Sequence, residues 1–511
     1  MINILDKMSS RKIELVKILS SETRYFSVKE LSEQLNISNK TLVRTVELLK
    51  EDMQSWTSNV EIQDKNILGY CLCQLDGFSI KEIEVYYYKD SIIYQVIDEL
   101  FHNKFVDIKT FANERYLSYT VVYTNIVEIR ELISDFSLEL ELNKKIHIKG
   151  TEMQIRYFYF SFYWNILGGV EWPFRFYDKQ NAFEYIEIIE TFYSRKLSVS
   201  ETEFFLYWIG TIFNRVHLMK KSVDCSQFHL YKGAYNELEK MLRPKLLSKN
   251  FAADSVDEEV LFIYLILFGF QPRRTYGEQD QTQIRTELNK NIESIVASYW
   301  MREFYGNFSV NLTISEQITL YTNLVIQHFR LMVFRGGGDF FENQNLFIPE
   351  CDPSMELLLK NAVKTIASEL FQIDQIKNLN LDRKLIESYY KQELYDLLTS
   401  DYRMGSIKVA IISQFGEKIN QHLKNIVISK TNVKIEFCSF TDADVDLIIS
   451  NRSYSEIIQK KNSQAELIIW NDTPTELDKK KVTEVLKKIS NQRQYSVFLE
   501  ALNTTVEEAI N

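Results

Sequence analysis

The stretch from Ser27 to Met53, SVKELSEQLNISNKTLVRTVELLKEDM, decides the fold of the N-terminal region. Ser27 stands three residues before Glu30, which is the spacing of a helix-opening capping box, so a helix is predicted to begin here. A break follows at 36–38, and Ser38 is predicted to cap a later helix. The apolar residues of this later helix recur at helical spacing, at Leu42, Val46, Leu49 and Met53. The stretch therefore predicts two helices joined by a short turn.

The outward face of the later helix carries residue types that read DNA. An amphipathic segment over 11–20 completes a helix-turn-helix, in which the first turns of the last helix enter the major groove. Asn and Arg side chains pair with base edges there, and Lys reaches phosphate. We therefore predict DNA contacts from Asn39, Lys40, Thr41 and Arg44, with Lys40 and Arg44 preferred. The alternative is a helical protein-interaction module.

Short strands follow this helix, and the whole order then recurs. Alternating apolar residues over 60–62 and 67–72 flank a polar turn and predict a wing. Downstream, helical patterns over 91–101, 107–113 and 118–136 precede two strands with a period of two residues, over 138–142 and 146–148. Two winged helix-turn-helix units in tandem explain both groups of helices and strands.

The last helix of the second unit is less basic than that of the first. It offers Tyr119, Thr120, Tyr123 and Arg130 outward. We take Tyr119, Thr120 and Tyr123 as candidate DNA contacts, which read phosphates or else pack against protein.

Composition predicts a mainly α-helical, multidomain protein. The 511 residues are 45% hydrophobic and 25% charged, with 15 Gly and 6 Pro, so turn-rich and disordered classes are excluded. The net charge of −10 means that any DNA contact must come from a local patch. No secretory signal is visible and the longest apolar run, over 260–270, is too short to span a bilayer, so we expect a soluble cytoplasmic protein that does not contact membranes. Five scattered cysteines predict neither disulfides nor a metal site.

The middle of the chain, from Glu171 to about Asp401, has an aromatic-rich helical pattern with a repeat of about 115 residues. Leu197-Ser-Val-Ser-Glu201 corresponds to Leu312-Thr-Ile-Ser-Glu316, and both have capping-box spacing. We predict two related helical bundles.

The histidines of these two bundles do not occupy matching positions. His328 precedes Arg335 by seven residues, which on one continuous helix places both on the same face. There the cation would stabilise a phosphoryl group on the imidazole, and Gly336-Gly337-Gly338 would end the helix. We take His217 and His328 as candidates for regulatory phosphorylation, against the alternative of hydrogen-bonded core histidines.

The last hundred residues change to a pattern of strands alternating with helices. Short apolar strands over 407–412, 433–437, 445–449 and 467–470 predict a parallel sheet with helices on both faces. The loop after the first strand, Ser413-Gln414-Phe415-Gly416, has neither a cysteine nor a glycine-rich phosphate cradle. Cys438 ends the second strand without a basic neighbour to activate it. We therefore predict a domain without catalytic residues that serves as an interaction surface.

This order of domains resembles the Mga family of virulence regulators from Gram-positive bacteria, a group that includes the anthrax toxin activator. The resemblance is carried by the domain order, by the Leu31–Met53 helix-turn-helix, and by the Leu197–Lys220 and Leu312–Arg335 segments, which look like the opening helices of phosphotransferase-regulated (PRD) domains. It implies winged helix-turn-helix domains at 1–78 and 79–165, PRD-like bundles at 166–287 and 288–401, and an α/β domain at 402–511 similar to a sugar-transporter IIB component (EIIB-like). This sequence departs from the IIB pattern because its first strand-to-helix loop lacks the phosphoryl-accepting cysteine.

The function predicted from all of this is a Mga-type transcription regulator that activates virulence or surface-protein genes and is modulated by histidine phosphorylation through the phosphotransferase system (PTS). The expected partners are double-stranded promoter DNA, a second copy of the chain or a higher oligomer, and a PTS phosphocarrier protein. We expect no enzyme activity, catalytic residue, cofactor or metal, since no Walker loop, HExxH helix or dinucleotide fingerprint occurs. The alternatives are a PTS enzyme component, for which Ser413 is the only candidate nucleophile, and a protein-interaction scaffold that does not bind DNA.

Overall fold

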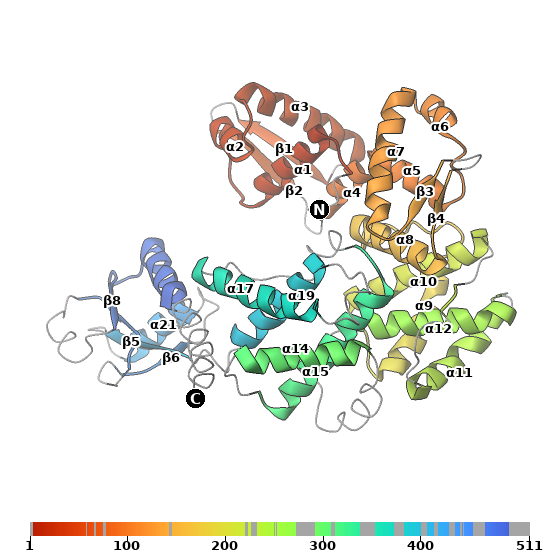
Figure 1. Ribbon diagram of the computed structural model, residues 1–511. Helices are drawn as coiled ribbons and strands as arrows, with labels where there is room; N and C mark the ends of the chain where they lie inside the picture. Colours follow the sequence, from red (N-terminus) through yellow and green to blue (C-terminus); the bar gives the residue numbers. More distant parts are fainter. Residues whose placement is uncertain are drawn as a thin grey trace. The chain divides into compact units, whose positions relative to one another are not determined.

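The computed structural model is mainly α-helical at its N-terminus and middle and ends in a small parallel sheet (Figure 1). It describes residues 4–57, 59–65, 68–74, 78–142, 146–219, 223–225, 232–249, 251, 253–271, 292–307, 312–337, 353–372, 383–399, 406–412, 417–428, 435–439, 442, 444–452 and 465–489. These group into two compact units, which are taken separately below: 1–273 with 326–344, and 274–325 with 345–511. No helix in the described ranges combines the length and apolarity that crossing a membrane requires.

The first winged helix comprises three helices and a two-stranded antiparallel sheet (Figure 1, red). Its elements are α1 (Lys7–Ser20), α2 (Val28–Gln34), α3 (Asn39–Trp56), β1 (Val60–Lys65) and β2 (Gly69–Gln74). The predicted stripe on α3 is buried, and it packs with α1 and the inward residues of the two strands in one core. This confirms the helix-turn-helix and the wing expected from the sequence.

The second winged helix repeats this arrangement with a shorter wing. It comprises α5 (Ile92–Phe101), α6 (Ile108–Glu114), α7 (Tyr119–Ser134), β3 (Glu139–Glu141) and β4 (His147–Lys149). Between the two winged helices lies α4 (Ile80–Asp90), which packs on α1, α5 and α8 (Glu152–Leu167). Tyr87 of α4 donates a hydrogen bond to Asp52 of α3 at 2.6 Å, so α4 ties the first winged helix to the rest of its unit.

The remaining helices of the first unit form an aromatic-rich bundle. They are α8, α9 (Lys179–Tyr193), α10 (Val199–Met219), α11 (Lys232–Ser248) and α12 (Ala253–Gly269), joined by the last turns of α15 (Ile314–Val333). Phe160 of α8 stacks on Trp208 of α10 at 4.0 Å between ring centroids, and both side chains are fully buried. The predicted buried helix over 260–270 is confirmed as part of α12.

The second unit contains three more helices and a four-stranded parallel sheet. The helices are α14 (Ile292–Asn307), α17 (Pro353–Leu370) and α19 (Arg383–Thr399), together with the first turns of α15. The strands β5 (Ile407–Ile412), β6 (Ile435–Phe437), β7 (Leu447–Ser450) and β8 (Glu466–Ile469) are arranged in the order β6-β5-β7-β8. Within the described residues, α21 (Glu417–Ile428) and a helix at 476–489 both pack on the same face of this sheet. The predicted parallel sheet is thereby confirmed, whereas helices on both of its faces stay a prediction, since both described helices lie on one face.

Candidate nucleic-acid interface

The turn between α2 and α3 fixes the direction in which α3 leaves the first core. Ser38 accepts a hydrogen bond from the Thr41 backbone N–H at 3.1 Å, and this cap starts α3. Asn36 has a φ of 51°, a left-handed conformation that Asn tolerates, and the next backbone N–H, of Ile37, bonds to the Ser32 carbonyl at 2.9 Å. The turn is therefore tight, and it directs the first turns of α3 outward.

The predicted contact residues lie on the exposed face of α3. Asn39, Lys40 and Arg44 are exposed, and neither Lys40 nor Arg44 forms an ion pair with any residue that the structure describes. Thr41 is half-buried, and its hydroxyl lies 2.8 Å from that of Ser38, so its side chain also supports the helix cap. Two cations without carboxylate partners near the start of an exposed helix are suited to bind phosphate or a guanine edge.

The wing adds polar groups that the sequence analysis did not single out as contacts. Lys65, at the end of β1, is exposed and places its ammonium 4.9 Å from the centre of the Tyr25 ring. Tyr25 in turn donates a hydrogen bond to Gln63 of β1 at 3.0 Å. Arg24, by contrast, is held by Glu22 and Glu30, and its pKa is raised by these hydrogen bonds. Of these two cations, Lys65 is therefore the one available to contact DNA. The polar turn predicted for the wing was the sequence signal that could have indicated it.

The second winged helix presents α7 by the same local geometry as α3. Ser118 caps α7 and accepts a hydrogen bond from the Val121 N–H at 3.3 Å, as Ser38 does in α3. Tyr116 has a φ of 57°, and the following N–H, of Leu117, bonds to the Ala112 carbonyl at 2.8 Å. Each of these positions lies 80 residues after its counterpart in the first winged helix, and the buried stripe on α7 keeps the same offset, at Val122, Ile126, Ile129 and Ile133.

The exposed surface of α7 is nevertheless chemically different. At the 80-residue offset, Tyr119 replaces Asn39 and Thr120 replaces Lys40. Tyr119 and Tyr123 are 55% and 43% exposed, and their rings stack at 6.2 Å between centroids. Thr120 is exposed too. The predicted residues Tyr119, Thr120 and Tyr123 thus lie together on the first two turns of α7, which carry no charge, whereas the exposed Arg130 lies further along the helix.

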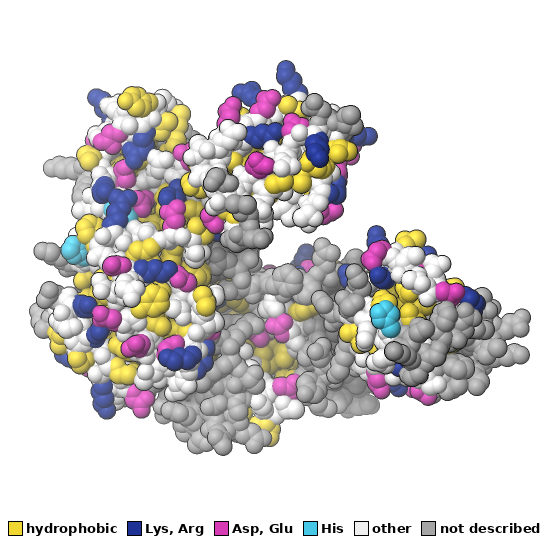
Figure 2. All heavy atoms as spheres, turned by 180° about the vertical axis from the view of Figure 1, so that it is seen from behind, with side chains coloured by type: hydrophobic (Ala, Val, Ile, Leu, Met, Phe, Trp, Pro, Cys, Tyr) yellow, Lys and Arg dark blue, Asp and Glu magenta, His cyan; other side chains and the backbone are white. Residues whose placement is uncertain are grey.

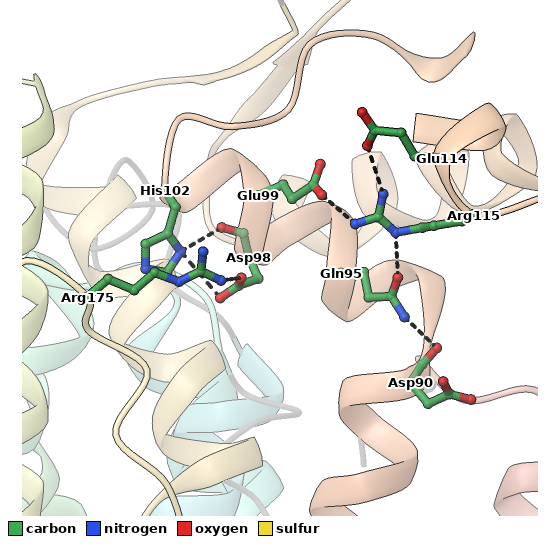
Figure 3. A network of polar contacts seen from close by, with 8 residues as sticks. All are labelled: Asp90, Gln95, Asp98, Glu99, His102, Glu114, Arg115 and Arg175. Atoms are coloured by element: carbon green, nitrogen blue, oxygen red, sulfur yellow. Dashed lines mark hydrogen bonds and ion pairs between the residues drawn. The ribbon is translucent and has the colours of Figure 1, made fainter. Parts of the chain in front are cut away.

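The cation within the α6–α7 turn is engaged with carboxylates. Arg115 contacts Glu99, Gln95 at 2.7 Å and Glu114 at 3.5 Å (Figure 3). On the face of the molecule shown in Figure 2, basic and acidic side chains are interspersed over the described surface. This agrees with the net charge of −10 and leaves DNA binding to local groups.

Comparison with known proteins identifies this region. Residues 76–163 match the profile of the Mga helix-turn-helix domain, and residues 11–70 match a general helix-turn-helix domain. The chain is related to the Mga family. The resemblance predicted from the sequence is thereby confirmed.

Curated relatives extend this Mga-type relationship beyond the matched domains. The capsule synthesis positive regulator AcpA of Bacillus anthracis is 25% identical over 303 residues, covering 58% of this chain and 60% of AcpA. AcpB of the same organism, also named a capsule synthesis positive regulator, is 23% identical over 41% of this chain and 43% of its own length. The anthrax toxin expression trans-acting positive regulator of Bacillus anthracis is 28% identical over 187 residues, which cover 36% of this chain and 38% of that regulator. The matched region therefore spans about two-fifths to three-fifths of these relatives. Their names are those of regulators and not of enzymes.

A second polar cluster anchors the Mga-type second winged helix to the helical bundle (Figure 3). Asp98 of α5 accepts hydrogen bonds from the Tyr163 hydroxyl and from Arg175, both at 2.8 Å, and His102 lies 3.4 Å away. Burial raises the pKa of Asp98, but the hydrogen bonds and positive charges of these partners, His102 first, more than offset it, so the pKa lies below its ordinary value. Asp98 is thus a charged structural residue.

A second network of charges, around Arg215 within the first predicted bundle, is structural as well. Arg215 of α10 is buried and bonds to both carboxylate oxygens of Glu152, at 3.0 and 2.7 Å. Arg156, with no exposed surface, bonds to Glu152 at 3.1 Å and to both oxygens of Glu259 at 2.6 and 2.9 Å. These four charges join α8, α10 and α12 and balance one another, so Arg215 is not available for an external phosphoryl group.

The two candidate histidines lie in opposite environments. His217 is exposed near the end of α10 and stacks on the Phe176 ring at 4.7 Å. His328 has no exposed surface. The prediction that Arg335 shares a helix face with His328 is wrong, because α15 ends at Val333 and Arg335 lies beyond it, exposed.

The described residues do not assemble a recognisable metal or nucleophile site. Of their His, Cys, Asp and Glu side chains, no three come together to hold a metal ion. Burial raises the pKa of Cys438, which disfavours the reactive thiolate. Ser413, the only candidate nucleophile for a PTS enzyme, lies outside the described residues.

Proposed function

We propose that the chain is a DNA-binding transcription regulator that activates virulence or surface-protein genes in the manner of the relatives named above. The single observation that carries the proposal is the outward face of α3, where Lys40 and Arg44 are exposed without a carboxylate partner among the described residues. An exposed cation can neutralise a phosphate without first breaking an ion pair, which supports DNA binding over a scaffold role. The printed names of AcpA and AcpB, both positive regulators, support activation.

The two winged helices would contribute differently to this binding. Lys40 and Arg44 of α3, with Asn39, Thr41 and Lys65 near them, provide charge and hydrogen bonds for phosphates and base edges. Tyr119, Thr120 and Tyr123 of α7 provide apolar and hydroxyl contacts, for which the thymine methyl group is the matching feature of the major groove. In this arrangement the first winged helix supplies most of the salt-dependent affinity, and the second supplies selectivity for sequence.

The remainder of the proposal concerns domain organisation and regulation. We assign winged helices to 1–78 and 79–165, PRD-like bundles to 166–287 and 288–401, and an EIIB-like domain to 402–511. The protein would act in the cytoplasm as a homodimer or higher oligomer, with its α/β domain as the contact surface, and would receive a phosphoryl group from a PTS phosphocarrier protein. The exposure of His217 supports it as an accessible acceptor, whereas His328 would first require a local opening of the bundle.

A protein-binding role for α7 is the second candidate function. It is favoured by the exposed aromatic pair Tyr119 and Tyr123 and by the absence of a cation at the position that matches Lys40. It would leave DNA binding to the first winged helix alone.

Footprinting on the region upstream of the protein's own gene tests the proposal. We expect the wild-type chain to protect a defined segment, and the Lys40→Ala/Arg44→Ala variant to lose this protection while remaining folded. Protection extending beyond a single half-site, and shortened by Tyr119→Ala/Tyr123→Ala, would support DNA contact by α7. No protection by the wild-type chain on this or any selected duplex would refute the proposal.

A further inference from the structure

The chain segment that follows α15 is in direct backbone contact with the end of α7. Gly336 has a φ of +85°, and a Cβ placed on it would lie 2.2 Å from the Asp135 carbonyl oxygen and 2.8 Å from the Phe136 Cα. Asp135 is the C-terminal cap of α7, and Phe136 is the next residue. The backbone of Gly336 therefore occupies space that any side chain at this position would need. These residues all belong to the first unit, although about 200 positions separate them in the sequence.

Side chains of α8 bind the backbone on the α15 side of this contact. The Tyr157 hydroxyl donates a hydrogen bond to the Gly336 carbonyl at 3.2 Å, and Gln154, one turn earlier, donates to the Val333 carbonyl at 3.1 Å. The Tyr157 ring lies 5.5 Å from that of Phe136 and 5.2 Å from that of Phe334, measured between centroids. Tyr157 thus contacts both sides of the junction, the end of α7 and the end of α15.

The anchoring residue Phe334 makes the contact rigid. It is buried, and its ring lies 5.1 Å from Phe270 and 5.8 Å from Trp208, in the aromatic core of the bundle. Close-packed aromatic side chains leave little freedom for a neighbouring segment to shift. Gly336 is two residues from this anchor, so its position is set by the bundle and not by the winged helix.

We infer that Gly336 and Tyr157 are positioning residues for α7: they fix the C-terminal end of this helix against the bundle and so set the angle at which α7 meets DNA. The inference rests on the proposed function, because α7 must read DNA for its angle to matter. It goes beyond that function by assigning the control of α7 to a segment far outside the winged helix. Any change that moves the end of α15 would reach α7 through this contact.

Substitution of two glycines separates the close contact from backbone strain. Gly336→Ala and Gly169→Ala both place a side chain at a positive φ, +85° and +80° respectively, but a Cβ at Gly169 meets nothing within 4 Å. Hydrogen exchange of the full chain without DNA is the first measurement. We expect Gly336→Ala to raise the exchange of amides at the end of α7 by roughly tenfold, through local opening, and Gly169→Ala to leave it within about twofold of wild type.

Tyr157→Phe removes the hydrogen bond to Gly336 and adds no atom, so it decides the matter if Gly336→Ala does not fold. We expect it to raise exchange at the same amides by a smaller factor than Gly336→Ala does. Wild-type exchange at the end of α7 in Tyr157→Phe, or in a folded Gly336→Ala, would overturn the positioning role, as would an equal increase in Gly336→Ala and Gly169→Ala.

DNA binding provides the second measurement, on a duplex selected by the wild-type chain from a random-sequence pool. We expect Gly336→Ala to bind this duplex about tenfold more weakly, which is the loss of affinity expected when one base contact is lost. The salt dependence of binding should equal that of wild type, because no cation is removed. A merely structural glycine would leave affinity unchanged well below the melting temperature, and that result would contradict the inference. Failure of the wild-type chain to select any duplex would refute the proposed function instead, and the exchange measurement would still test the contact.

Discussion

The salt dependence of DNA binding is the quantity that most directly tests the role of α3. Lys40 and Arg44 are both exposed on this helix, and neither is paired with a carboxylate in the described part of the chain. Each phosphate that a cation neutralises contributes about −0.9 to the slope of log K against log salt concentration. Replacing both residues with Ala should therefore make the slope shallower by about 1.8 for each chain bound.

This change of slope corresponds to a large difference in affinity. Between 50 mM and 200 mM salt, the wild-type chain should lose about twelvefold more affinity than the double variant. If two chains bind one site, the slope should change by about 3.6, so the same titration reports the number of chains engaged. Fluorescence anisotropy on a labelled duplex, at five or more salt concentrations, gives both values.

A matched control separates local contact from overall charge. Lys196→Ala/Lys488→Ala removes the same two charges, but from exposed lysines outside the winged helices that pair with Glu190 and Glu466, both at 2.6 Å. We expect this variant to keep a slope close to that of wild type. If Lys40→Ala/Arg44→Ala remains folded and shows the wild-type slope, or if the control lowers the slope equally, α3 is not the phosphate-binding helix.

Four further outcomes are expected. Arg156→Ala should lower the free energy of unfolding by about 3–5 kcal/mol, because it leaves buried carboxylates uncompensated. Lys196→Ala breaks only an exposed ion pair and should leave the free energy of unfolding nearly unchanged in the same urea titration; equal losses in the two variants would contradict the buried ion network. Glu201 has a pKa lowered to about 2 from 4.5, chiefly by its hydrogen bonds to Arg195, so its contribution is complete above pH 4.5 and is lost as the pH falls toward 2. Glu201→Gln should therefore make the free energy of unfolding depend less on pH between pH 4.5 and 2. An unchanged pH dependence would mean that other carboxylates cause the loss of stability in acid. Because His328 is buried, His328→Ala should lower the melting temperature and His328→Asp should lower it further, whereas a wild-type melting temperature for both, with opposite effects on promoter activity, would restore a switch at this position. Truncation before Ser406 should convert a dimer to a monomer in sedimentation velocity, and undiminished dimerisation would place the interface elsewhere.

Much of the fold was predictable because its signals are local. Ser38 was expected as a helix cap, and it accepts the predicted type of hydrogen bond from the first turn of α3. The buried stripe on α3 and the alternation in β1 and β2 follow from periodicity alone, since one face of each element must be removed from water. The strands of the C-terminal sheet were found as short apolar runs instead, because a parallel strand such as β7 is buried along its whole length.

The candidate site was predictable only where exposure follows from the same periodicity. Lys40 and Arg44 fall outside the buried stripe of α3, so their exposure could be deduced. The surroundings of Arg215 could not, because its partner lies far away in the sequence. Arg215 pairs with Glu152, 63 positions earlier, and no local pattern indicates such a pair. The Arg335 prediction failed because α15 stops at Val333, where burial of Phe334 and a hydrogen bond from Gln154 outside the helix end it.

The two winged helices show why backbone contacts matter more for α7 than for α3. Both helices start from the same capped turn, 80 residues apart, so the buried residues give them equal scaffolds. A helix with free cations is drawn to the phosphates, and these charges help to set its orientation on the duplex. The first two turns of α7, which carry Tyr119 and Tyr123, have no such charge, since the exposed Arg130 lies further along the helix, and apolar contacts act only at close range. Its orientation must therefore be fixed from the protein side before DNA is met, and the backbone contact with Gly336 at its C-terminal end is placed to do this.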